Sequence, residues 1–195
     1  MWPYMHSIGG QFFRVGAAVV ATGISVKMMD DYLDKDLDLH GNIYHVLKEG
    51  LLPYALVALA LGSLGAPSIA VSLFLSAYCL GMAFSPLDRL PTDLVGYQES
   101  LVLMLVQFLL LPWVRVLNSL AVIACVQILD DLIDQDIDQG DNLVQRLGFG
   151  EAMIIGGFCL ILGVYTDWMV TVWAMLLMVV INLWQPGDFP PERLS

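Results

Sequence analysis

Two aspartate-rich segments are the part of this sequence whose residue types and spacing could do chemistry. The first runs from Asp30 to Asp38 as DDYLDKDLD, and the second runs from Asp130 to Asp138 with aspartates at the same five positions. Together they hold ten aspartates and one lysine, and so carry −9 of the net charge of −11. This acidity argues against nucleic acid as a partner, because a phosphate backbone selects for basic patches.

The two segments belong to an internal repeat. Residues 26–50 match residues 126–150 without a gap at nine of 25 positions, which include all five aspartates and the pair Asn42 and Asn142. The flanking apolar positions exchange among Leu, Ile, Met and Val. A single acidic cluster at a helix end is usually a solvated surface, but its duplication indicates a role for the acids themselves.

Four aspartates of each segment fall on one face of a helix that advances about 100° per residue. In the first segment they are Asp30, Asp31, Asp34 and Asp38. In the second they are Asp130, Asp131, Asp134 and Asp138. Asp36 and Asp136 fall on another face. Stacked carboxylates near a membrane stay ionised only with compensation, so we predict that the eight aspartates of the two stripes are metal ligands.

His40 and His45 lie in the connecting loop and no cysteine is near the aspartates, so the expected ligands are oxygen atoms. Oxygen ligands favour a hard cation. Mg²⁺ is the expected ion, with Mn²⁺ and Ca²⁺ as alternatives. Mg²⁺ combines a few carboxylates with substrate phosphates, so two facing stripes suit a metal-bridged diphosphate. A cavity inside a helical bundle could hold an apolar tail, which favours a lipid-linked substrate.

The rest of the chain has the composition of a protein that lies in the bilayer. Of its 195 residues, 58% are hydrophobic and 14% are charged, and the mean hydropathy is +0.74. We expect an all-α, polytopic transmembrane bundle forming a single domain over residues 1–195. Seven helices are predicted, at about 10–31, 50–64, 68–85, 99–111, 113–131, 150–164 and 167–184. Polar residues inside them are expected to hydrogen-bond to neighbouring helices, namely Tyr78, Gln107, Asn118 and Gln127.

The repeat divides this bundle into repeat 1 (about 10–85), a connecting helix (about 99–111) and repeat 2 (about 113–184). A break at Pro112 puts the acidic segments four helices apart, which makes the repeats parallel and places both segments on one membrane face. That face would carry more basic residues than the other, namely Lys35, Lys48, Arg89, Arg146 and Arg193 against Arg14 and Arg115. The positive-inside rule therefore predicts an integral protein of the plasma (inner) membrane with the acidic segments in the cytoplasm.

The first segment resembles the NDxxDxxxD signature of the UbiA superfamily of membrane prenyltransferases, with Asp30 in the place of the Asn. The second resembles that family's second aspartate motif, and Gln145-Arg146-Leu147-Gly148 is similar to the RLG that often follows it. The family has nine helices, with aspartate motifs ending its second and sixth. The seven helices expected here match that plan without the first and last, so the resemblance covers nearly the whole chain.

The resemblance implies a Mg²⁺-dependent enzyme that ionises an isoprenyl diphosphate and transfers the prenyl group to an acceptor. We expect Asp34 and Asp134 to be catalytic. The basic RxxNRPL-like run that follows the family's first motif is missing here, so the expected diphosphate-binding residues are Lys27, Lys35, Lys48 and Arg146. Two alternatives stay open: a divalent-cation transporter, and a non-catalytic membrane protein that binds a lipid diphosphate. Neither the prenyl chain length nor the acceptor follows from the sequence.

Overall fold

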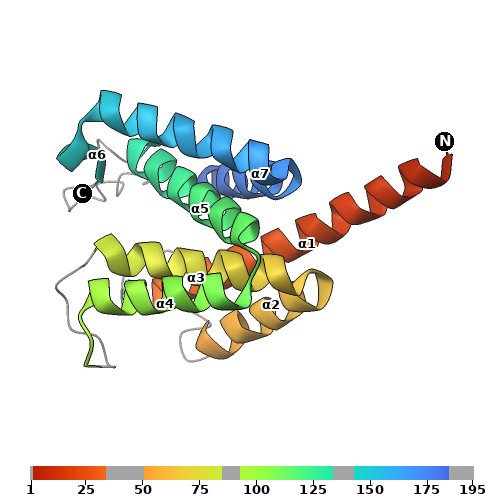
Figure 1. Ribbon diagram of the computed structural model, residues 1–195, viewed down its shortest axis with the longest axis horizontal. Helices are drawn as coiled ribbons and strands as arrows, with labels where there is room; N and C mark the ends of the chain where they lie inside the picture. The colour runs from red at the N-terminus through yellow and green to blue at the C-terminus, as the bar shows by residue number, and fades with distance from the viewer. Residues whose placement is uncertain (1, 34–50, 85–92, 134–142, 185–195) are drawn as a thin grey trace, which may run out of the picture.

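The computed structural model describes residues 2–33, 51–84, 93–133 and 143–184, which form seven α-helices (Figure 1). They are α1 (Trp2–Leu33), α2 (Leu51–Gly65), α3 (Pro67–Phe84), α4 (Gly96–Leu110), α5 (Trp113–Ile133), α6 (Leu143–Leu147) and α7 (Phe149–Trp184). The prediction of an all-α fold is confirmed for this described part of the chain.

Three of these helices are long and apolar enough to cross a bilayer. The candidate spans are Gly9–Asp30 in α1, Trp113–Ile133 in α5 and Phe149–Leu183 in α7, and α2, α3 and α4 are apolar but shorter. Outward-facing leucines such as Leu64 and Leu109 are more than 80% exposed. Large exposed apolar surfaces of this kind suit contact with lipid rather than with water, as in a membrane protein.

Two breaks between helices lie where the sequence predicted turns. α4 ends before Leu111, which is extended with φ −123° and ψ 152°, and α5 begins directly after Pro112. α7 contains 36 residues but is interrupted at Asp167, whose φ of −159° and ψ of 94° are not helical. The Asp167 carboxylate accepts a hydrogen bond of 3.3 Å from the backbone N–H of Val170. It therefore caps the second segment of α7, residues 167–184.

The starts of two helices were predicted wrongly, and one short helix was not predicted. α1 begins at Trp2 rather than near residue 10, since Pro3 in its first turn costs no helical hydrogen bond. α4 begins at Gly96 rather than near residue 99, where the Gln98 side-chain oxygen accepts the backbone N–H of the preceding Val95 at 3.4 Å. The helix α6 was not predicted, because five residues are too few for a periodic pattern.

The centre of the bundle is an apolar cluster to which four helices contribute. Its buried residues come from α1, α3, α5 and the second segment of α7: Val15, Val19, Ile69, Leu73, Val122, Val170 and Ala174. The cluster joins the first half of the chain (α1 to α3) to the second half (α5 to α7).

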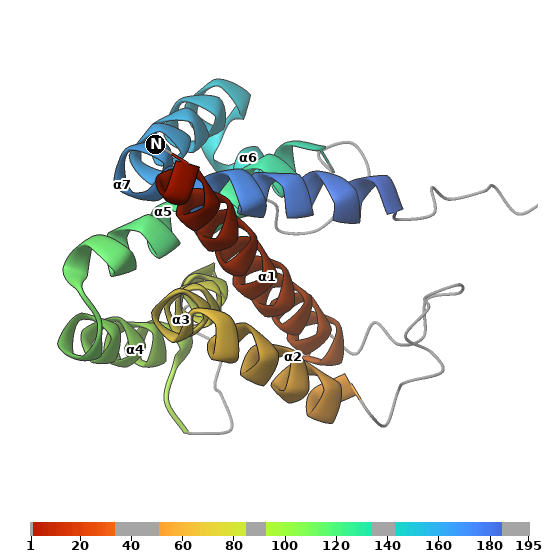
Figure 2. The same ribbon diagram turned by 90° about the vertical axis from the view of Figure 1, so that its right-hand side faces the viewer.

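The first helix of each half packs against the last helical segment of the other half. α1 packs on the second segment of α7, where Gly16 lies against the Trp173 ring and the indole N–H of Trp173 donates to the Phe12 carbonyl at 3.1 Å. α5 packs on α3, where the Ser72 hydroxyl donates to the Arg115 carbonyl at 3.4 Å. Figure 2 shows α1 running between α7 and α2. The contact between the halves is therefore reciprocal.

Replacing Gly16 by Ala is expected to lower the free energy of unfolding by about 1–3 kcal/mol, as overpacking of a tight contact does. The new Cβ would lie 2.3 to 2.7 Å from atoms of the Trp173 ring. Thermal unfolding of the detergent-purified protein, followed by circular dichroism, measures the change. Gly10→Ala is the matched control, because nothing lies within 4 Å of a Cβ at Gly10. Equal melting temperatures for the two variants would contradict the packing of α1 on α7.

Candidate functional site

The first aspartates of both acidic segments lie on the last turns of α1 and α5. Asp30 and Asp130 are exposed and Asp131 is partly exposed. Asp31 belongs to the same turn of α1 as Asp30. The other predicted acids lie outside the described residues, namely Asp34, Asp36, Asp38, Asp134, Asp136 and Asp138. Of the predicted diphosphate-binding residues, Lys35 and Lys48 also lie outside, whereas Lys27 is on α1 and Arg146 is on α6.

The buried residues near the ends of α1 and α5 recur at every third position in both helices. The buried side chains before the first aspartates are Thr22, Ser25 and Met28 in α1, and Val122, Cys125 and Ile128 one hundred positions later in α5. A spacing of three keeps each set on one helix face. Asp30 and Asp130 come two residues after the last buried position, about 200° around the helix axis. Both carboxylates therefore point away from the packed face.

The chain returns to each of these helix ends after the acidic segment. α2 begins with the fully buried Leu51, which packs with Met28. α6 brings Val144 into contact with Ile128. Positions 28 and 128 are equivalent in the repeat, so the first described residues after each acidic segment pack against the same turn of the helix that precedes it.

The two acidic segments start at one side of the molecule. α1 and α5 run in the same direction, and their carboxyl-terminal ends both lie toward the left of Figure 1. α6 lies on that side as well. α3 and α7 each pack against both α1 and α5, and so hold the two ends relative to each other.

Carboxylates are electrostatically costly at these positions. The carboxyl-terminal end of a helix carries a partial negative charge, and neither α1 nor α5 has a basic residue in its last turn. Lys27 lies one turn earlier and is partly exposed; Lys27, Asp30, Asp131 and Arg146 each have an interaction partner. Repulsion among further aspartates at the same ends would be relieved by a bound cation, and carboxylate oxygens suit a hard divalent ion.

Within the described residues, no group of three or more His, Cys, Asp or Glu side chains is placed to hold a metal ion. A ligand set built from the two stripes must therefore include aspartates beyond Leu33 and Ile133, in residues 34–38 and 134–138.

Gly148 connects α6 to α7 and has a φ of +100°, which L side chains adopt only with strain. Its N–H donates to the Val144 carbonyl at 2.8 Å, and its own carbonyl accepts from the N–H of Ala152 at 3.0 Å. This turn fixes the direction of α6 and so places the exposed Arg146 on the side where the acidic segments begin.

Two of the polar residues inside helices bond to neighbouring helices, as predicted. Gln107 accepts a hydrogen bond of 3.1 Å from the Ser76 hydroxyl, and the Asn118 side-chain amide donates to the Gly163 carbonyl at 2.9 Å. Sequence reasoning did not predict the ion pair of 2.7 Å between Arg115 and Asp167, at the other end of the bundle. Both residues are isolated charges among apolar neighbours, which was the available signal, but 52 positions separate them.

Comparison of the chain with family models, with curated proteins and with solved structures finds no match. The resemblance to the UbiA superfamily therefore stays a prediction from the two acidic motifs and their surroundings.

Replacing Gly148 by Ala is expected to lower the free energy of unfolding by about 1–3 kcal/mol, the usual cost of a strained backbone conformation. The Cβ would also meet the Glu151 carboxylate at 2.6 Å. Unfolding in mixed detergent micelles, followed by tryptophan fluorescence, reports the difference. Gly150→Ala serves as control because nothing lies within 4 Å of that position. A Gly148→Ala protein as stable as the control would rule out the left-handed turn between α6 and α7.

Proposed function

We propose that this chain is a UbiA-like, Mg²⁺-dependent membrane enzyme that transfers the prenyl group of an isoprenyl diphosphate to an acceptor. The observation that carries the proposal is the placement of the duplicated acidic segment. Both copies begin on the exposed last turn of an apolar helix, and the two helices run in the same direction and end at one side of the molecule.

Helix boundaries and packing support two parallel repeats as the frame of this site. α3 and the second segment of α7 cover residues 67–84 and 167–184, one hundred positions apart. Gly62 approaches Thr22, and Gly163 approaches Val122, which is the equivalent of Thr22 in the repeat. The packing of α1 on α7 and of α5 on α3 is the reciprocal contact that a twofold axis between equivalent halves generates.

The proposed reaction begins when the allylic C–O bond breaks and its electron pair leaves with the diphosphate. The acceptor then forms a bond to the allylic carbon and loses a proton. Carboxylate-bound Mg²⁺ supplies the charge neutralisation that makes diphosphate a good leaving group. In this scheme Asp34 and Asp134 are catalytic, and Lys27, Lys35, Lys48 and Arg146 contact the diphosphate. The bilayer accommodates the isoprenyl chain.

A divalent-cation transporter is the less favoured alternative. Such a protein needs carboxylates at the middle of the membrane, where the ion is exchanged between the two sides. Asp30 and Asp130 instead lie on the last turns of α1 and α5, and the spans before them hold no other acid. An acidic group confined to one helix end suits binding of a substrate at the membrane surface.

Diphosphate release from allylic diphosphates of several chain lengths tests the proposal. With Mg²⁺ the purified protein is expected to release diphosphate, and EDTA is expected to abolish the release. Asp34→Asn and Asp134→Asn should each reduce the rate about 100-fold, because each removes a ligand of the metal that neutralises the charge developing on the diphosphate.

Asp93→Asn is the matched control for these variants. Asp93 is an exposed carboxylate outside the acidic segments with a φ of 62°, a conformation that Asn also adopts. Its rate should equal that of the unsubstituted protein. Metal-independent release, or release that survives both substitutions, would refute the enzyme. Metal-dependent binding without release would instead identify a lipid-diphosphate-binding protein, and ion flux in liposomes without diphosphate a transporter.

The acidic segments are proposed to face the cytoplasm. A cysteine introduced at the exposed Arg146 should then react with a membrane-impermeant maleimide only after the cells are opened. A cysteine at the exposed Ser68, at the opposite end of the bundle, should react in intact cells. The background is a variant in which Cys79, Cys125 and Cys159 are replaced by Ala. The reverse labelling pattern would invert the proposed orientation.

A further inference from the structure

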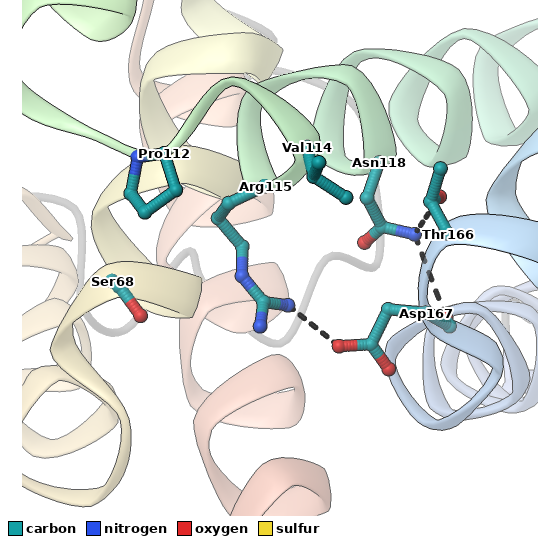
Figure 3. A pocket seen from close by; sticks show the side chains of 7 residues that line it. All are labelled: Ser68, Pro112, Val114, Arg115, Asn118, Thr166 and Asp167. Atoms are coloured by element: carbon teal, nitrogen blue, oxygen red, sulfur yellow. Dashed lines mark hydrogen bonds and ion pairs between the residues drawn. The ribbon is translucent and has the colours of Figure 1, made fainter.

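A small pocket lies at the end of the bundle opposite the acidic segments (Figure 3). It has a volume of about 180 Å³. Its lining residues come from α3, from the α4 to α5 turn, from α5 and from the α7 break: Ser68, Pro112, Val114, Arg115, Asn118, Thr166 and Asp167. This space is large enough for several water molecules, or for one small polar group.

With α5 spanning a bilayer, the pocket would lie at the level of the lipid headgroups. α5 begins at the pocket and ends at the second acidic segment, 21 residues later. At about 1.5 Å per residue this is roughly 30 Å, the thickness of the hydrocarbon core. In such a bilayer the pocket and the start of the second acidic segment would lie at opposite surfaces.

Three helical segments begin at the pocket. α3 starts at Pro67, α5 starts at Trp113, and the second segment of α7 follows the break at Asp167. Helix amino termini carry a partial positive charge and free N–H groups, which favour an anion. Asp167 already caps the α7 segment, so the termini of α3 and α5 are the ones left to act on a ligand.

Arg115 adds a full positive charge to the same space. One terminal nitrogen of its guanidinium donates to the Asp167 carboxylate at 2.7 Å, and its side chain is 24% exposed. A guanidinium has five N–H donors in a planar fork, more than this one ion pair uses. Arg115 can therefore hold Asp167 and a ligand phosphate at once, which is a geometry that arginine favours.

Asn118 offers a hydrogen-bond acceptor to the pocket, whereas Arg115 offers donors. Its side chain is only 1% exposed, and its amide nitrogen donates to the Gly163 carbonyl at 2.9 Å and lies 3.0 Å from the Thr166 hydroxyl. Because a carbonyl can only accept, this contact fixes the orientation of the amide. The side-chain oxygen of Asn118 is left without a partner in the described structure, and in Figure 3 it points into the space between Arg115 and Asp167. A buried acceptor of this kind requires a donor.

We propose that this pocket binds a phosphate ester that carries a primary ammonium group, as in the headgroup of phosphatidylethanolamine. The phosphate contacts Arg115 and the amino termini of α3 and α5. The ammonium donates to the unpartnered Asn118 oxygen and lies beside the Asp167 carboxylate. An ammonium suits these acceptors better than a hydroxyl because Asp167 is charged. This inference does not depend on the proposed enzymatic activity.

Native mass spectrometry of the full-length protein, after release from nanodiscs of mixed lipids, tests the site. Phosphatidylethanolamine should be retained about tenfold over phosphatidylcholine, because the trimethylated headgroup keeps phosphate and charge but has no N–H donor, and one charged hydrogen bond is worth about that factor. The N,N-dimethyl lipid, which keeps one donor, should lie between the two. Phosphatidylglycerol, whose headgroup offers hydroxyl donors only, should be retained no better than phosphatidylcholine.

Substitutions at the pocket test whether the lipid preference arises there. Arg115→Gln should lower the retention of both lipids, because Arg115 contacts the phosphate that they share. Asn118→Leu should abolish the preference. Arg14→Gln should leave it intact, because the Arg14 guanidinium donates to the Gly65 carbonyl and does not line the pocket. If the pocket variants fail to fold, the methylation series on the unsubstituted protein still decides.

Soluble competitors identify the source of the headgroup. Displacement of the retained lipid by millimolar phosphoethanolamine, but not by inorganic phosphate, would show that the pocket recognises the phosphate and ammonium together and also accepts the soluble ester. No displacement by either, with the lipid preference intact, would assign the site to the lipid. Equal retention of phosphatidylethanolamine and phosphatidylcholine, or phosphatidylglycerol retained as well as phosphatidylethanolamine, would overturn the inference. A preference unchanged in Asn118→Leu, or lipid retention unchanged in Arg115→Gln, would overturn it as well.

Discussion

Close packing between helices, both within and between the two halves of the chain, is the constraint on which the remaining features depend. In lipid the hydrophobic effect does not drive helices together, because acyl chains are as apolar as leucine side chains. Association has to come from small residues that allow close approach and from hydrogen bonds between helices. Gly16 against Trp173 and Gly62 against Thr22 are contacts of the first kind. Ser76 with Gln107, and Asn118 with Gly163, are contacts of the second kind.

This packing explains how the two acidic segments come to one side. α1 and α5 are held through α3 and α7, which each touch both of them. α1 packs on α7 and α5 packs on α3, and Asp30 and Asp130 are both exposed. In the proposed enzyme, a diphosphate would then lie between two equivalent groups of acids. Repulsion between those groups, rather than any attraction, would be what makes the metal necessary.

The two ends of the bundle differ in electrostatic character for a structural reason. At one end α1 and α5 finish, and their partial negative charges add to those of the aspartates. At the other end α3, α5 and the second segment of α7 begin, and their partial positive charges add to that of Arg115. Asp167 offsets part of this charge through its ion pair and its cap. The polarity of α5 alone thus favours a cation at one membrane surface and a phosphate at the other.

The sequence by itself determined the helical class, the membrane-compatible composition, the breaks at Pro112 and Asp167, and the acidic repeat. These follow from local properties: apolar length, proline, and identical residues at a fixed separation. It did not predict α6, because five residues carry no periodic signal. It also did not predict that the turn at Gly148 directs α6, and with it Arg146, to the side where the acidic segments begin. The tertiary structure alone decided the contacts between distant positions, above all the pairing of Arg115 with Asp167 and the unpartnered oxygen of Asn118. Both depend on how α5 meets the break in α7, which is set by side-chain packing across 52 positions and not by any local pattern.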